Sequence, residues 1–193
     1  MVGIVSFLYA VAFVILQNNL LSALFLMLGG LLSSGVVVAI YNRLREPDAA
    51  FALWALMLGI AGALGSAVHG GYDLANAINP VDSAPSELPN PIDPRGLLAF
   101  GVAGVALLVI AWLIMRGGRF PRGLGYVAYV SAALLIILYL GRLIVLEATS
   151  PVIVLPALLN GFLVNPALYL WLGVAVLSRR EATTQQSREE VEA

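Results

Sequence analysis

Long stretches without a charged side chain constrain this sequence more than any other feature. Residues 1–42 carry no charge, and four further uncharged stretches cover residues 49–72, 96–115, 123–141 and 148–178. A transmembrane helix needs about 20 consecutive, mostly apolar residues, because the hydrocarbon core of a bilayer is roughly 30 Å thick. The pattern therefore predicts an all-α, polytopic integral membrane protein.

Composition supports this prediction and excludes several classes of function. Only 11% of the 193 residues are charged, whereas roughly 25% are charged in a soluble domain. A net charge of −1 gives no basic excess for a nucleic-acid partner. With one histidine and no cysteine or lysine, the chain lacks the residues for disulfides, bis-histidine haem or a retinal Schiff base. We therefore expect no cofactor.

We predict a six-helix transmembrane bundle within residues 1–178. The first uncharged stretch is long enough for two spans, and Gln17-Asn18-Asn19 is its only polar run. One 40-residue helix would be about 60 Å long, so we favour a tight turn at this run, although a single tilted helix remains the alternative. No basic segment precedes the first helix, and we expect it to be a retained span rather than a signal peptide. The expected helices cover residues 2–17, 20–41, 50–77, 96–115, 124–147 and 152–178.

The arginines predict the orientation of the bundle. Eight of the ten basic residues, which are all arginine, lie in alternate connections or the tail: Arg43, Arg45, Arg116, Arg119, Arg122, Arg179, Arg180 and Arg188. By the positive-inside rule, these segments and both termini are cytoplasmic. The proline-rich loop 79–95 is then extracytoplasmic, as a plain connector or as a lid, and the polar tail 179–193 is expected to be disordered. Arginine-only basic usage with abundant Ala, Gly, Leu and Val favours a bacterial inner membrane.

The third predicted helix carries the most informative polar residues. His69, Tyr72, Asp73 and Asn76 fall at positions i, i+3, i+4 and i+7, which lie on one face of a helix. An ionisable group at membrane depth is costly unless it faces the bundle interior or water. This face is therefore predicted to point inward.

The fifth predicted helix brings Arg142 and Glu147 to a similar depth. Arg142 needs an anion, and Asp73 and Glu147 are the carboxylates expected near it. We predict an Arg142–Asp73 ion pair with Glu147 competing, which is either part of a functional site or a structural lock between helices. Alternatively, Arg142 snorkels to the outer headgroups.

The sixth predicted helix contains residues that interrupt a regular backbone. Pro156 and Pro166 each remove a helical hydrogen bond, and Asn165 before Pro166 has the pattern of a helix N-cap. The span is either kinked or broken into two half-helices, and in the second case Asn160 and Asn165 would line a cavity. Both asparagines are therefore candidate site residues.

Small residues mark the faces where helices approach each other. Small-xxx-small spacing permits close backbone contact within the bundle, in a homo-oligomer or in a larger membrane complex, with membrane lipids around it. The residues are Gly29, Gly30, Ser33, Ser34, Gly35, Ala55, Gly59, Gly62, Ser66, Gly70, Gly101 and Gly104.

Three classes of function remain open. The first is a small transporter, channel or ligand-binding protein with an outer pocket formed by the candidate residues. The second is a non-catalytic subunit of a larger membrane complex. The third is an enzyme on a lipid-like substrate, with His69 and Asp73 as an acid–base pair, although no motif supplies a nucleophile. We expect no metal site, because Arg142 would oppose a cation at His69, Asp73 and Glu147.

Overall fold

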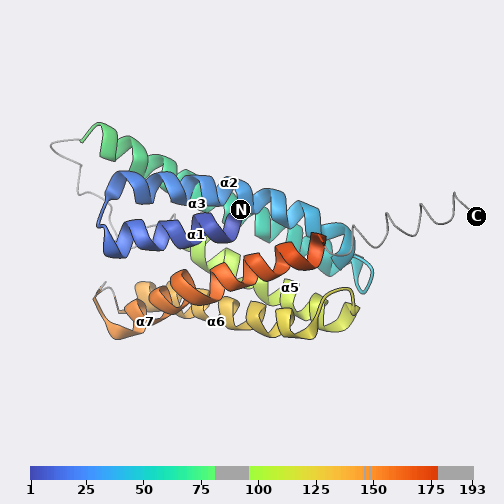
Figure 1. Ribbon diagram of the computed structural model, residues 1–193. Coiled ribbons are helices and arrows are strands. Elements are labelled where there is room, and N and C mark those ends of the chain that lie inside the picture. The colour runs from blue at the N-terminus through green and yellow to red at the C-terminus, as the bar shows by residue number, and fades with distance from the viewer. Residues whose placement is uncertain (81–95, 146, 148, 178–193) are drawn as a thin grey trace, which may run out of the picture.

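The computed structural model describes residues 1–80, 96–145, 147 and 149–177, and every regular element in these ranges is helical (Figure 1). The predicted all-α membrane fold is thereby confirmed in its main feature, because five helices are long and apolar enough to cross a membrane. Most of the loop 79–95 and the whole tail 179–193 lie outside the described residues. The five helices are Asn19–Leu44, Ala49–Ile78, Ala99–Gly117, Arg122–Ile144 and Pro151–Leu177.

The first apolar segment is shorter than the others. α1 (Val2–Ala10) continues directly into the π-helical turn η1 (Val11–Ile15). A helix over Val2–Ile15 is about 21 Å long, which is less than the roughly 30 Å of a hydrocarbon core. Figure 1 accordingly shows the N-terminus midway along the bundle. The described residues thus form five helices long enough to cross a membrane and one shorter apolar helix.

A tight turn separates this first helix from α2 (Asn19–Leu44), as we favoured from the sequence. Gln17 has a positive φ of 49°, and the Asn18 side chain accepts a hydrogen bond from the Leu21 backbone nitrogen at 3.0 Å. Asn18 therefore acts as the N-cap of α2, which satisfies one of the donors that a helix start leaves open. Residues 1–44 form two helices rather than one.

The next helices run up and down in sequence order (Figure 1). α3 (Ala49–Ile78) begins after the N-cap Asp48, whose side chain accepts from the Phe51 nitrogen at 3.1 Å. The following span consists of η2 (Leu97–Val102) and α5 (Ala103–Gly117), and it ends at Gly118 with a φ of 64°. α6 (Arg122–Ile144) returns antiparallel to it.

The last span is irregular but continuous, which corrects the broken-helix alternative. It consists of α7 (Pro151–Leu159), the π-helical turn η3 (Asn160–Val164) and a helical segment 165–177. Asn165 has φ −68° and ψ −45°, so it is a helical residue and not the N-cap that its position before Pro166 indicated. Local π adjustment lets a membrane helix accommodate proline without separating into two halves.

Small residues bring α2 and α3 into backbone contact. A Cβ added at Gly30 would lie 2.5 Å from the Ala67 nitrogen, and one at Gly70 would lie 2.3 Å from the Met27 nitrogen. A Cβ at Gly62 would meet Ala103 at the start of α5 at 2.9 Å. These glycines serve packing between helices of the same chain.

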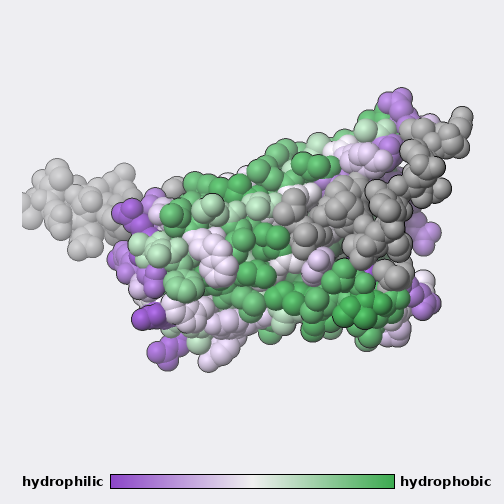
Figure 2. Space-filling model, turned by 180° about the vertical axis from the view of Figure 1, so that it is seen from behind, coloured by the Kyte–Doolittle hydropathy of each residue, from purple (hydrophilic) through white to green (hydrophobic). Residues whose placement is uncertain are grey.

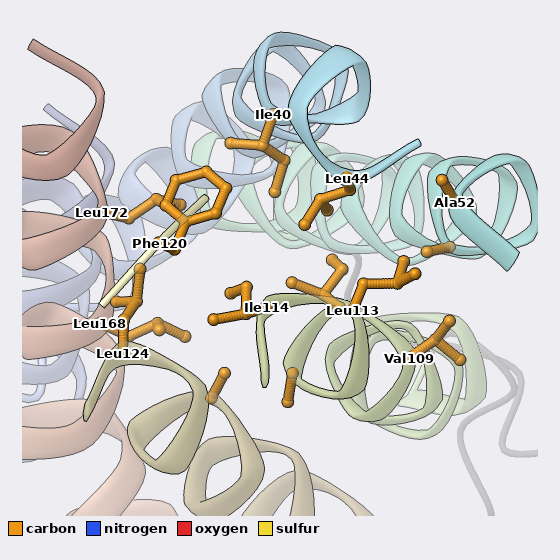
Figure 3. Close-up of a cluster of buried hydrophobic side chains, with 14 residues drawn as sticks. Ile40, Leu44, Ala52, Val109, Leu113, Ile114, Phe120, Leu124, Leu168 and Leu172 are labelled. Atoms are coloured by element: carbon orange, nitrogen blue, oxygen red, sulfur yellow. The ribbon is translucent and has the colours of Figure 1, made fainter. Parts of the chain in front are cut away.

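A buried apolar cluster, whose side chains Figure 3 shows, consists of residues near the α2–α3 and α5–α6 connections and in the second half of the last span, and so lies toward one end of the bundle. That end, which we call the Arg-rich end, carries the α2–α3 and α5–α6 connections with Arg43, Arg45, Arg116, Arg119 and Arg122. The surface in Figure 2 is largely hydrophobic between two more polar ends, as expected where lipid covers the helices. The cluster consists of Ile40, Leu44, Ala52, Ala55, Val109, Ile110, Ala111, Leu113, Ile114, Phe120, Leu124, Ala128, Leu168 and Leu172.

Candidate functional site

His69 and Asp73 form the centre of the candidate site. They lie one turn apart near the C-terminal end of α3, at the end of the bundle opposite the Arg-rich end (Figure 1). The His69 Nε2 atom is 3.2 Å from the Asp73 Oδ2 atom, and the two side chains are 14% and 40% exposed. The imidazole is therefore largely enclosed, while the carboxylate still reaches the surface of the bundle.

The rest of the predicted polar face of α3 points outward. Tyr72 is 56% exposed and Asn76 is exposed as well. The spacing i, i+3, i+4 and i+7 spreads over a broad stripe of the helix, and His69 and Asp73 are less exposed than Tyr72 and Asn76. Tyr72 and Asn76 stand at the rim of the cluster rather than inside it.

Tyr9 on α1 joins the cluster, and the sequence interpretation did not include it. Its ring stacks on Phe13 with the centroids 5.8 Å apart, and Ser6, one turn earlier, accepts a hydrogen bond from Asn165 of the last span at 2.7 Å. Ser6 and Tyr9 are the only side chains in residues 1–16 that carry a hydroxyl, and they stand three residues apart. This spacing on an otherwise apolar helix was the available signal for an inward polar face.

The predicted ion pair between Arg142 and Asp73 is not observed. In the described part of the chain, Arg142 makes no ion pair or hydrogen bond, and its side chain is exposed in the last turn of α6. A guanidinium there interacts favourably with the negative end of the helix dipole and can extend toward headgroups. Asp73 contacts His69 on its own helix.

Glu147 does not compete for Arg142. It lies beyond the end of α6, in the connection to α7, and its side chain is exposed. Its Oε1 atom accepts a hydrogen bond from the Thr149 hydroxyl at 3.0 Å. This contact shapes the α6–α7 connection and leaves Asp73 as the carboxylate of the cluster.

The two asparagines of the last span bind serines on neighbouring helices. The buried Asn160 accepts a hydrogen bond from the Ser131 hydroxyl of α6 at 2.9 Å. Asn165 donates its amide to the Ser6 hydroxyl of α1 at 2.7 Å. Interhelical hydrogen bonds of this kind hold membrane helices together. Both residues thus have a packing role that explains their presence in an apolar span.

The cluster combines an imidazole, a carboxylate, a phenol and a guanidinium from three helices. Among residues with a described position, no group of three or more His, Asp or Glu side chains is arranged to hold a metal ion. Comparison with protein-family models, curated proteins and solved structures finds no match for this chain. Its function must therefore be inferred from the chemistry of the cluster.

Proposed function

We propose that this chain is a multi-pass protein of the bacterial cytoplasmic membrane that binds a small polar ligand at Tyr9, His69, Asp73 and Arg142, as a small transporter or channel does. The observation that carries the proposal is the contact of the His69 imidazole with the Asp73 carboxylate at 3.2 Å, in a half of the bundle that also holds Tyr9 and Arg142. A site with a guanidinium, a carboxylate and a hydroxyl offers a solute both hydrogen-bond donors and hydrogen-bond acceptors.

The cost of these groups supports a functional role. A charged side chain in the middle of a membrane helix costs about 2.5–3.5 kcal/mol on insertion scales, and the cost is lower toward the ends of the helices, where Asp73 and Arg142 lie. Asp73 contacts His69 and is still 40% exposed, so its carboxylate can also meet a ligand. Ligand binding gives both charges a reason to be retained.

The proposed topology follows from the arginines. With the Arg-rich end in the cytoplasm, the cluster lies in the outer half of the membrane. α1 runs in the same direction as α3 and α6 (Figure 1). We therefore place the N-terminal side of α1 toward the cytoplasm and count this short helix as the sixth element within the membrane. The C-terminus then also lies on the cytoplasmic side.

A ligand panel tests this proposal. The purified full chain is heated in detergent with single amino acids, short carboxylates, amines, sugars and inorganic phosphate. A ligand at a hundredfold excess over its Kd stabilises a protein by about 2.7 kcal/mol, which is readily visible as a shift in melting temperature. We expect one chemical class to stabilise the wild type and Arg45→Gln, a control at the opposite end, but neither Asp73→Asn nor Arg142→Gln. Stabilisation that persists in both cluster variants contradicts the proposal, as does a panel without any stabilising compound.

An acid–base enzyme is the second candidate, and the His69–Asp73 contact favours it. A carboxylate that holds an imidazole at 3.2 Å orients it as a general base. Mass spectrometry of phospholipid substrates after incubation with the protein separates the two functions, because only an enzyme produces new species that are lost in His69→Gln. A partner-binding subunit has less support, since Gly30, Gly62 and Gly70 contact helices of their own chain.

A further inference from the structure

A group of aromatic rings lies on the surface near the Arg-rich end, far from the polar cluster. Phe51 and Trp54 stand in the first turns of α3, with ring centroids 6.0 Å apart, and Trp112 of α5 lies 5.1 Å from Phe51. Phe51 is 44% exposed and Trp54 is 46% exposed. Two helices thus present one continuous aromatic surface to the surroundings.

Arg116 covers one edge of this aromatic group. Its Cζ atom lies 5.0 Å from the centre of the Trp112 ring, one helical turn further toward the end of α5. The side chain is exposed, and it makes no hydrogen bond or ion pair with any residue whose position the structure gives. A guanidinium that stacks on an indole keeps its five N–H donors directed outward in its own plane. Arg116 is therefore held in place while its donors remain available.

Two other arginines at this end are engaged within the protein. Arg119 forms a bidentate ion pair with Glu46, which ties the α5–α6 connection to the α2–α3 connection. Arg43 donates to the carbonyl oxygens of Ala175 and Val176, at 3.5 Å and 3.2 Å, near the end of the last span. Neither guanidinium stands on the lipid-facing aromatic surface as Arg116 does.

We propose that Arg116, Trp112, Phe51 and Trp54 bind an anionic phospholipid, with its phosphate at Arg116 and its glycerol and upper acyl chains along the aromatic rings. Tryptophan prefers the headgroup level of a membrane, and arginine at this level attracts anionic lipids. A guanidinium also matches the planar, bidentate geometry of a phosphate. The aromatic rings beside it are a poor surface for a free ion but suit the amphipathic part of a lipid. This site is separate from the proposed ligand site and does not depend on it.

Native mass spectrometry of the full chain in detergent tests the proposal. The probes are dioleoylphosphatidylglycerol and dioleoylphosphatidylcholine, which have the same acyl chains and different headgroups. We expect the anionic lipid to bind roughly tenfold more tightly, and Arg116→Gln to remove most of this preference. Arg45→Gln is the matched control, because Arg45 is exposed at the same end but stacks on no ring. Trp112→Leu keeps an apolar side chain and is expected to weaken the preference by releasing Arg116.

Several outcomes would overturn this site. If Arg116→Gln and Arg45→Gln reduced the preference for the anionic lipid equally, the end of the bundle would attract anions without a specific site. Equal affinity of the wild type for both lipids would remove the role of the headgroup charge. Competition by millimolar inorganic phosphate would assign the site to a free anion. Within the described protein Arg116 makes no hydrogen bond and one exposed cation–π contact, so its replacement should lower the melting temperature without lipid only slightly, and a large fall would reveal a folding defect.

Discussion

Replacement of Gly70 by alanine tests the link between helix packing and the polar cluster. Gly70 follows His69 on α3, where the backbone of α2 passes directly beside it. A Cβ at this position would lie 2.3 Å from the Met27 nitrogen and 2.7 Å from the Ala23 carbonyl oxygen. Both atoms belong to a helix backbone, which cannot rotate away as a flexible side chain does. The two helices must therefore move apart.

The size of the effect follows from this geometry. Ordinary contacts of a Cβ begin at 3.4 Å, so α2 and α3 must separate locally by about 1 Å. Overpacking of this kind costs about 1–3 kcal/mol, whereas alanine in place of glycine within a helix gains about 0.5–1 kcal/mol. We expect a net loss of about 1–2 kcal/mol, or a fall in melting temperature of roughly 2–8 °C.

The matched control is the neighbouring glycine. A Cβ at Gly71 would lie 3.8 Å from the Met27 sulfur, an ordinary contact, and one at Gly35 would meet nothing within 4 Å. Gly71→Ala and Gly35→Ala should therefore keep or raise the melting temperature in detergent. If Gly70→Ala were as stable as Gly71→Ala, the close approach of α2 and α3, and the positioning of His69 that depends on it, would be refuted.

Two further predictions concern the interior of the bundle and its first turn. Ser131→Ala leaves the buried Asn160 oxygen without its donor, and we expect the free energy of unfolding to fall by about 1 kcal/mol. In a double-mutant cycle with Asn160→Leu, the two losses should be less than additive, because both variants remove the same 2.9 Å contact; additive losses would show that this contact contributes nothing. Gln17→Gly removes the strain of a side chain at φ 49° and should raise the stability by up to about 1 kcal/mol relative to Gln17→Ala. Equal melting temperatures of these two variants would argue against a left-handed residue at the turn.

The membrane fold could be predicted from the sequence because charge is excluded from a bilayer whatever the tertiary structure is. The Gln17-Asn18-Asn19 run likewise predicts a turn, since Asn18 is a preferred helix cap. The same run predicts the length of the first helix, since the expected helix 2–17 and the observed Val2–Ile15 end within two residues of each other. Hydropathy does not predict which neighbours this helix has: Gly3 packs against Pro166 and Leu170 of the last span, and Val5 lies beside Gly29 of α2.

Sequence position places the candidate residues along the helices but not around them. Asp73 and Arg142 lie toward the C-terminal ends of α3 and α6, and the similar depth expected from their residue numbers led to the predicted ion pair. They contain no information about the rotation of α6, which leaves Arg142 exposed in its last turn. His69 reaches Asp73 within one helix and needs no interhelical approach, so this contact forms at a lower entropic cost.

The two ends of the bundle differ in a way that bears on the proposed ligand site. The large apolar cluster, the Arg119–Glu46 pair and the Arg43 contacts all lie toward the Arg-rich end. The π-helical turns η1 and η2 lie toward the opposite end, and η3 interrupts the last span near its middle. π-helical turns often occur at functional sites, because they re-aim side chains without ending a helix. The polar cluster lies in the half of the molecule opposite the Arg-rich end, but His69 is next to Gly70, where the backbones of α2 and α3 are in contact. A change in helix position on ligand binding would therefore involve α1 and α6, which carry Tyr9 and Arg142, rather than a separation of α2 and α3.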